Sequence, residues 1–157
     1  MRPIRSVSVL MPTWQGMEFL DRVLHALSTQ RVDVSWDFRA IDSGSTDGTW
    51  ELLRQRAEKD ARLRPLRHAT SAGQSTSVWQ AAWAARGTWL GTLDGDGQND
   101  PADLPDLYRQ LTRRDAPEGL KMVMGRRAKR KDTAWKRFGS RFANNIRTVD
   151  GGTHIEG

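Results

Sequence analysis

Residues 88–98 read TWLGTLDGDGQ, a short apolar run that passes directly into two aspartates separated by one glycine. Residues 88–93 have the length and composition of a buried strand, and residues 94–98 are typical of a turn. A turn interrupts the alternation of side chains along a strand, so Asp94 and Asp96 can both face one ligand. The stretch therefore predicts a strand that delivers two carboxylates to its carboxyl end.

The same succession of strand and helix repeats along the chain. Residues 7–11 and 38–41 are short apolar runs typical of buried strands, and Pro65 confines a weaker run, residues 63–66, to a sheet edge. Residues 120–124 are a further candidate strand. Apolar residues at helical spacing form five groups: Leu20, Val23, Leu24 and Leu27; Trp50, Leu53 and Ala57; Val78, Ala81, Ala82 and Ala85; Leu104, Leu107, Tyr108 and Leu111; and Trp135, Phe138, Phe142 and Ile146.

Strands that alternate with helices predict an α/β fold, here a single domain with a mostly parallel, doubly wound sheet. Ligands of such sheets bind beyond the carboxyl ends of the strands. Polar clusters stand at three of these ends, in residues 12–16, 42–47 and 94–98. We expect the three clusters to form one site. Asp47 and Asp103 are expected to cap the helices that follow them.

The composition of the chain limits the classes of ligand that such a site can bind. The 157 residues carry 25 Lys and Arg against 19 Asp and Glu, a net charge of +6 that suits nucleic acid, an acidic membrane surface or phosphate-bearing small molecules. Cysteine is absent, so a metal must bind through oxygen or histidine. No run reaches the roughly 18 apolar residues of a membrane span. We expect a cytoplasmic location, at most peripheral to the cytoplasmic face of a membrane.

Paired carboxylates on a turn suit a hard cation. Mg²⁺ and Mn²⁺ sites commonly use one or two protein carboxylates and complete the shell with water and substrate phosphates, and Gln98 offers a further neutral oxygen. The pattern thus favours a diphosphate substrate. An ordinary polar turn accounts equally well for residues 94–97 taken alone. A calcium loop of the EF-hand type is excluded because Pro105 stands where its last acidic ligand belongs.

Other phosphate and hydrolase chemistries lack their signatures. The chain contains no G-x-x-x-x-G-K-[ST] loop, no strand-associated G-x-G-x-x-G and no G-x-S-x-G. Asp42 stands at the end of a predicted strand, where an acidic residue can accept a hydrogen bond from a base or a ribose hydroxyl. Trp79 and Trp83 lie four residues apart, away from the alanine face of their helix, and either pack against absent segments or a partner, or belong to the core.

Three of these elements together resemble the inverting family 2 glycosyltransferases of the GT-A fold. Residues 6–13 look like their first strand, residues 41–49 like their V-D-D-G-S-x-D-G-T element and residues 93–101 like their D-x-D-x-Q-x-x-P element. The likeness implies a nucleotide-sugar-binding GT-A domain over residues 1–147, with residues 148–157 as a tail.

Two subfamilies share the resemblance. Residues 73–101, 125–127 and 135–141 are most similar to dolichyl- or polyprenyl-phosphate sugar synthases, whereas the first sixty residues look more like rhamnosyltransferases. Two departures from the family pattern concern the nucleoside side. Residues 14–16 read WQG in place of Y-N-E, and Ser43 replaces the second acidic residue of the second element.

The resemblance also implies a set of site residues. Pro12 and Thr13 would contact the nucleoside, and Asp42 would bind the base or the ribose. Asp94, Asp96 and Gln98 would hold Mg²⁺ or Mn²⁺ against the diphosphate. Further contacts to phosphates of donor or acceptor are expected from Arg126, Arg127, Arg137 and Ser140, because arginine bonds phosphate oxygens in pairs. Asp150 is a candidate general base, although a polar turn explains it better.

These observations favour a metal-dependent inverting glycosyltransferase that uses a nucleoside-diphosphate sugar and transfers to a polyprenyl phosphate or a glycan. One alternative is a nucleotide-sugar-binding fragment without turnover, since the family's acceptor-side segment is missing from the sequence. The other is a nucleic-acid-binding module, based on the basic residues 126–131 and seven tryptophans. No recognised nucleic-acid motif supports it. Beside Trp135 and Phe138, the basic run suits peripheral contact with an anionic bilayer, although an ordinary solvated basic face explains it equally well.

Overall fold

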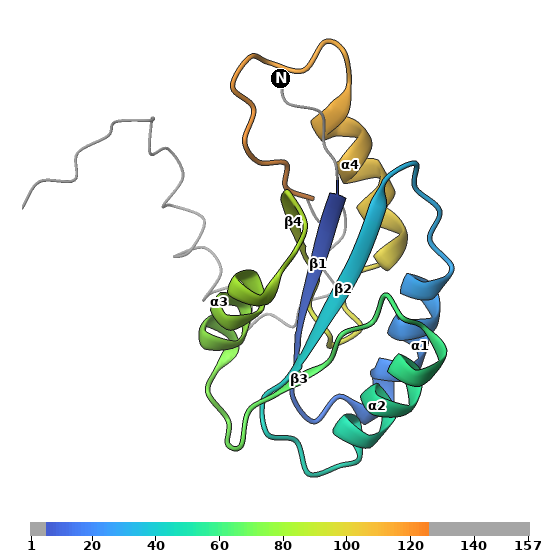
Figure 1. The fold of residues 1–157 in the computed structure, drawn as a ribbon, viewed down its shortest axis with the longest axis vertical. Coiled ribbons are helices and arrows are strands. Elements are labelled where there is room, and N and C mark those ends of the chain that lie inside the picture. The colour runs from blue at the N-terminus through green and yellow to red at the C-terminus, as the bar shows by residue number, and fades with distance from the viewer. Residues whose placement is uncertain (1–5, 126–157) are drawn as a thin grey trace, which may run out of the picture. The chain divides into compact units, whose positions relative to one another are not determined.

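A computed structural model describes residues 6–125, whose strands form a parallel sheet in the order β3-β2-β1-β4 (Figure 1). The strands are β1 (Ser6–Thr13), β2 (Ser35–Asp42), β3 (Leu66–Arg67) and β4 (Trp89–Thr92). The helices are α1 (Met17–Ser28), α2 (Thr49–Lys59), α3 (Gln74–Ala84), the short 3-10 helix η1 (Pro101–Asp103) and α4 (Leu104–Thr112). Within this range, none of the helices combines the length and hydrophobicity needed to cross a bilayer. The predicted α/β fold with a parallel sheet is confirmed.

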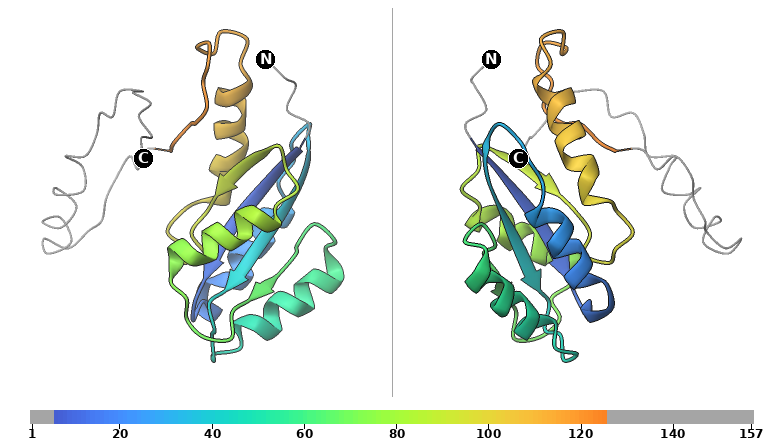
Figure 2. Two further views of the ribbon diagram at one scale, coloured as in Figure 1. Left: turned by 60° about the vertical axis from the view of Figure 1, so that its left-hand side comes forward. Right: turned by 90° about the vertical axis from the view of Figure 1, so that its right-hand side faces the viewer.

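The two faces of the sheet bury different residues. Figure 2 shows α3 across one face and α1 with α4 on the other. On the α1 side, Val9 and Met11 of β1 belong to a large core with Leu20, Leu24 and Phe38. On the α3 side the core is smaller and consists of Leu10, Ile41 and Ala81, with further partly buried residues around it. Alternation along the central strands and helical spacing in α1 and α3 thus produce the layers that the pattern predicts.

The strands that follow β1 in the chain lie on both sides of it in the sheet. The chain adds β2 and β3 on one side of β1 and then returns through α3 to add β4 on the other. Such a switch point leaves a crevice beyond the carboxyl ends of the two neighbouring strands. Backbone bonds continue past β4, from Leu93 N to Leu10 O at 3.0 Å and from Gly95 N to Pro12 O at 3.2 Å. The Asp94 turn is therefore fixed against the end of β1.

Two predicted strands differ from the structure. Within the predicted range, residues 63–65 supply only an isolated bridge from Leu63 to Phe38, and β3 proper is the pair Leu66–Arg67 at the sheet edge. Pro65 has no N–H with which to extend the ladder. The strand expected over residues 120–124 is wrong, because these residues have no regular structure and Met122 and Met124 are exposed. An apolar run alone does not make a strand without a neighbour to pair with. The expected last helix lies outside the described residues.

The helix cap expected at Asp103 is only partly right. Asp103 occupies the N-cap position of α4, but its side chain makes no cap hydrogen bond. Asp100 instead caps η1, since its Oδ1 accepts a hydrogen bond from Ala102 N at 2.9 Å. The short 3-10 turn before α4 moves the capping role three residues towards the N-terminus.

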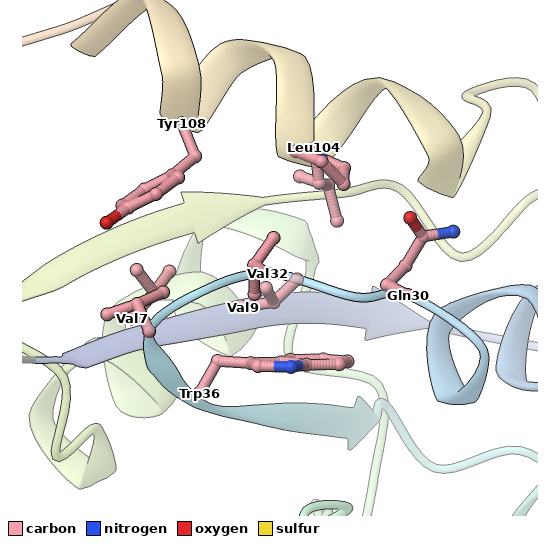
Figure 3. A pocket seen from close by; sticks show the side chains of 9 residues that line it. Val7, Val9, Gln30, Val32, Trp36, Leu104 and Tyr108 are labelled. Atoms are coloured by element: carbon pink, nitrogen blue, oxygen red, sulfur yellow. The ribbon is translucent and has the colours of Figure 1, made fainter. Parts of the chain in front are cut away.

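A small apolar pocket of about 40 Å³ lies near the amino ends of β1 and β2. Figure 3 shows Val7 and Trp36 from the strands, with Leu104 and Tyr108 reaching them from α4. Val7 and Trp36 are register partners at the start of their strands. The pocket is thus apolar and stands at the end of the sheet opposite to the three polar clusters.

Candidate functional site

A cavity of about 370 Å³ stands at the carboxyl ends of β1 and β4. All three polar clusters contribute to its wall, together with residues from the segment between β3 and α3. The lining residues are Pro12, Thr13, Trp14, Gln15, Gly16, Phe19, Ser43, Ser71, Gly73, Gln74, Ser77, Asp94, Gly95 and Asp96. The structure therefore brings together the strand-end clusters that the sequence places at one edge.

The segment from Ser71 to Ser77 was not predicted as part of the site. Two hydrogen bonds hold it there: Ser43 Oγ accepts from Ala72 N at 3.1 Å, and Gln74 Nε2 donates to Asp94 Oδ1 at 2.8 Å. Its composition of Ser, Ala and Gly resembles any surface loop. The sequence could have placed this segment at the site only from its position after an edge strand of the same parallel sheet. That strand, β3, has two residues and is too short to be recognised from the sequence.

Asp94 and Asp96 are the charged residues among those that line the cavity. Asp94 is half-buried, and its two oxygens accept from the side-chain amides of Gln74 and Asn99, the latter at 3.1 Å. Asp96 is exposed, and its Oδ1 accepts from Gln98 N at 3.0 Å. Among residues 6–125, neither carboxylate has a basic ion-pair partner. Within these residues no cationic side chain occupies the two carboxylates, so their oxygens can serve as ligands of a bound metal ion.

The site offers no complete metal cage of its own. Within the described part of the chain, no cluster of three or more His, Cys, Asp or Glu side chains could hold an ion. Gln98 lies in the same turn, exposed, and outside the residues that line the cavity. Two oxygen donors on a turn fit Mg²⁺ or Mn²⁺, which take few protein carboxylates and leave positions for substrate phosphates. The donor set fits such an ion only together with an anionic ligand.

Close backbone approach shapes the wall around Thr13. A Cβ on Gly16 would lie 2.5 Å from Thr13 Oγ1, and one on Gly95 would lie 2.9 Å from Pro12 O. Glycine is therefore needed at position 95 for its turn to reach the end of β1, and a side chain at position 16 would crowd the Thr13 hydroxyl. Thr13 Oγ1 is buried and has no hydrogen-bond partner among residues 6–125. An orphaned hydroxyl at a cavity wall is a candidate ligand contact.

Asp42 is fully buried and already engaged by the protein. Its Oδ1 accepts from Ser45 N at 3.1 Å, and its Oδ2 lies 3.3 Å from Arg67 Nε in an ion pair without hydrogen-bond geometry. Arg67 also donates to Ser45 O at 3.0 Å. Asp42 and Arg67 together fix the loop after β2, whereas direct contact between Asp42 and a nucleoside stays a prediction.

Asp47 ties two helices to one loop. Gly48 rather than Asp47 is the N-cap of α2, yet Asp47 Oδ1 accepts from Thr49 N at 3.1 Å and from Thr49 Oγ1 at 2.6 Å. Its Oδ2 accepts from Met17 N, the first residue of α1, at 3.1 Å. Burial raises the pKa of Asp47, but the hydrogen bonds from Thr49 and Met17 outweigh it and leave the pKa below its ordinary value. The capping role is thus shared between two helices.

The other predicted phosphate contacts and the candidate base lie outside the described residues. These are Arg126, Arg127, Arg137, Ser140 and Asp150. Their roles stay predictions.

A protein-family model described as Glycosyl transferase family 2 matches residues 8–152, nearly the whole chain. The chain belongs to this family. Solved structures agree on the fold. A mannosyltransferase from Pyrobaculum calidifontis, determined with GDP-Man and Mn²⁺, aligns with a TM-score of 0.59 and 23% identity over 68% of this chain and 32% of that one. S. aureus TarS 1–349 with UDP-GlcNAc gives a TM-score of 0.52 and 22% identity over 58% of this chain and 26% of that one. The fold of the family 2 chain is that of the GT-A glycosyltransferases.

Curated relatives of the family 2 chain point to one subfamily. The undecaprenyl-phosphate 4-deoxy-4-formamido-L-arabinose transferase of Pseudomonas aeruginosa is 31% identical over 145 residues, which cover 90% of this chain and 41% of that protein. The enzyme of the same name from Salmonella choleraesuis is 28% identical and is covered over 43% of its length. The chain spans about two fifths of the length of these relatives. Their names match the predicted polyprenyl-phosphate likeness, and the rhamnosyltransferase likeness stays a prediction.

Proposed function

We propose that the chain is the donor-binding part of a metal-dependent, inverting glycosyltransferase that carries a sugar from a nucleoside diphosphate to a polyprenyl phosphate. The observation that carries the proposal is the pair Asp94 and Asp96, without basic partners among residues 6–125, at a cavity built from three strand-end clusters. Family membership supports the reaction class. The names of the relatives support the lipid-phosphate acceptor.

Asp94 and Asp96 are the residues proposed to hold Mg²⁺ or Mn²⁺, with Gln98 as a further oxygen donor. When bound, such an ion stabilises the negative charge of the departing nucleoside diphosphate as a Lewis acid. Support comes from the oxygen-only donor set and from a fold neighbour determined with GDP-Man and Mn²⁺. Gln74 and Asn99 position Asp94, because each amide N–H donates to one carboxylate oxygen and fixes its rotation.

The wall of the cavity is proposed to bind the donor. Pro12 and Thr13 lie at the end of β1, where the nucleoside is expected, and the orphaned Thr13 hydroxyl is free to bond it. Asp42 holds its loop through Ser45 and Arg67, and its contact with the base or the ribose remains part of the proposal. Arg126, Arg127, Arg137 and Ser140 remain the proposed contacts to phosphates.

The acceptor decides whether a general base is needed. Inversion requires the acceptor oxygen to attack the anomeric carbon from the side opposite to the departing diphosphate. A phosphate monoester is ionised at neutral pH, since its second pKa is about 6. It therefore attacks without losing a proton to the protein, and Asp150 is required as a base only if the acceptor is a glycan hydroxyl. The names of the relatives support a lipid acceptor, and the proposed site of the reaction is the cytoplasmic face of a membrane.

The proposal is tested by substitution of Asp96→Asn. The intact chain should be stabilised in thermal-shift measurements by UDP, GDP or dTDP sugars only when Mn²⁺ is present. Asp96→Asn should remove that Mn²⁺-dependent stabilisation without altering the melting temperature of the free protein, because Asp96 is exposed. Asp103→Asn, an exposed aspartate without a cap hydrogen bond, is the matched control. Unchanged Mn²⁺-dependent binding by Asp96→Asn would disprove the metal assignment.

Two other functions remain distinguishable. A nucleotide-sugar-binding fragment without turnover would bind donor with Mn²⁺ but give no product with a polyprenyl phosphate, so binding and transfer are measured on the same preparation. A nucleic-acid-binding role rests on the basic residues 126–131 and the seven tryptophans. The family match over residues 8–152 favours the sugar-transfer role instead.

A further inference from the structure

Three arginines meet on the face of the sheet that α3 crosses (Figure 2). Arg39 of β2 pairs in register with Leu10 of β1, which belongs to the core on the α3 side. Arg64 follows Leu63, whose side chain lies in the core on the α1 side, so the alternation of an extended chain directs Arg64 to the α3 side. Arg86, between α3 and β4, is the third.

A single carboxylate, that of Asp37, serves these arginines. Asp37 Oδ2 lies 3.6 Å from Arg39 Nη2 and 3.5 Å from Arg64 Nε, and its Oδ1 accepts from Ser8 Oγ at 2.5 Å. Ser8 Oγ in turn accepts from Arg86 N at 3.3 Å, which holds the third arginine beside the other two. Arg86 has no ion-pair partner among residues 6–125. Three positive charges against one negative charge leave this cluster an excess of two positive charges.

Arg39 is the buried member of the cluster, and its hydrogen-bonding capacity is not satisfied. The residue is 6% exposed, and its Nε has no hydrogen-bond partner in the described part of the chain. The Nε of Arg64 is also buried without such a partner there. Burial lowers the pKa of Arg39 below its ordinary value, Asp37 opposes this effect, and repulsion by Arg64 and Arg86 adds to it. Buried guanidinium donors are normally bonded, so the two Nε atoms point to an anionic ligand.

The cluster is open to solvent on its outer side. The Arg64 side chain is 39% exposed, and Arg86 is exposed. The neighbouring helix α3 carries no charged residue that could neutralise the arginines, and its tryptophans, Trp79 and Trp83, are exposed rather than part of the core. An anion from solvent can therefore reach Arg64 and Arg86.

We propose that Arg39, Arg64 and Arg86 form a binding site for a phosphate group, with Arg39 as its buried base and the other two as its rim. A guanidinium bonds two phosphate oxygens with its planar fork, which a carboxylate or chloride matches less well in charge. A phosphate monoester carries a charge of about −1.5 to −2 at neutral pH, which balances the excess of the cluster.

This site is separate from the cavity at the carboxyl ends of the strands. Ser8 and Asp37 lie in the amino halves of β1 and β2, and none of the three arginines lines the cavity. The inference therefore goes beyond the proposed function and does not depend on it.

Titration of the whole chain with inorganic phosphate tests the proposal, without Mn²⁺ or nucleotide sugar. Phosphate should raise the melting temperature more than chloride does at the same ionic strength, because a ligand of the folded chain stabilises it. Arg86→Gln should weaken phosphate binding in calorimetry at least about tenfold, since a charge-assisted hydrogen bond is lost. Arg54→Gln, an exposed arginine of α2, is the matched control with unchanged binding. Glycerol phosphate in place of the free ion shows whether a monoester is preferred.

Two further variants separate a ligand site from an internal ion pair. Asp37→Asn keeps an oxygen for Ser8 Oγ but removes the charge that competes with the ligand, so phosphate should bind about fivefold more tightly. Arg39→Met removes the buried charge and should abolish the effect of phosphate on the melting temperature. Circular dichroism checks that each variant is folded, and Arg86→Gln carries the test if a buried variant is not, because Arg86 is exposed.

Three results would overturn the proposal. A phosphate effect no larger than that of chloride excludes a site, and unchanged phosphate binding by Arg86→Gln places the ion elsewhere on the chain. Phosphate affinity that Asp37→Asn leaves unchanged assigns the cluster a structural role only. Mn²⁺-dependent binding of nucleotide sugars is measured separately and should persist in Arg86→Gln, so failure of the phosphate site is distinguished from failure of donor binding.

Discussion

Two aspartate-rich turns of similar composition follow β2 and β4, and the structure uses them differently. At the end of β2, Asp42 is fully buried and Ser45 nearly so. The carboxylates of Asp42 and Asp47 are bonded by backbone N–H groups and the Thr49 hydroxyl or paired with Arg67. After β4, Asp94 is bonded by side-chain amides and Asp96 is exposed. An aspartate whose oxygens the backbone and an arginine occupy serves the fold. One that only neutral amides hold remains available to a ligand.

The largest expected effect is a difference in the free energy of unfolding between a variant of the first turn and a variant of the second. Asp42→Ala should lower the free energy of unfolding by about 3 kcal/mol, because Arg67 loses its buried partner and Ser45 N loses its acceptor. Asp94→Ala should lower it by less than about 1 kcal/mol, since its partners can turn to water. Urea unfolding of both variants measures the difference. Equal losses in the two variants would show that both turns are structural.

The sequence predicted the sheet and the meeting of the strand ends well, for a physical reason. Apolar runs such as residues 7–11 and 38–41 are buried on both faces, so they are recognisable without their neighbours. Parallel pairing then places every carboxyl end at one edge. The run of residues 120–124 is equally apolar but has no regular structure, because pairing depends on a partner that composition does not reveal.

The site was harder to predict in two places. Burial of Asp42 against Arg67 depends on the register of β2 and β3, which pairs these two residues across the sheet. Sequence alone leaves Asp42 open to solvent and to a nucleoside. The lining role of Ser71 and Gln74 depends on the path of a loop after a two-residue strand. Long-range geometry of this kind has no local signature in composition or periodicity.

A second prediction tests whether the side-chain amides of Gln74 and Asn99 orient Asp94 for metal binding. Gln74→Ala should weaken Mn²⁺-dependent nucleotide-sugar binding about tenfold, because Asp94 Oδ1 loses the donor that orients it. Gln80→Ala is the matched control on the same helix, since Gln80 bonds His68 and does not line the cavity. Titration calorimetry of both variants provides the affinities. If Gln80→Ala weakens binding as much as Gln74→Ala, the effect belongs to α3 as a whole.

The smallest expected effect concerns the charge of Asp47 in the structural turn. Asp47→Ala should lower the free energy of unfolding at pH 7 by about 1 kcal/mol, as loss of a helix cap does. The pKa of Asp47 in the folded chain lies below its ordinary value of 3.8, because the hydrogen bonds from Thr49 and Met17 outweigh burial.

This contribution is therefore complete above about pH 4 and is lost as the pH falls through the folded pKa. Urea unfolding at pH 7 and near pH 3 should show the difference between the wild-type chain and Asp47→Ala shrinking with acid. The pKa of Asp60 is also lowered, through its hydrogen bonds with Arg62, but this group is the same in both proteins and cancels in the comparison. A difference that stays constant with pH would mean that Asp47 acts by shape rather than by charge. The turn after β2 would then differ from the turn after β4 in packing alone.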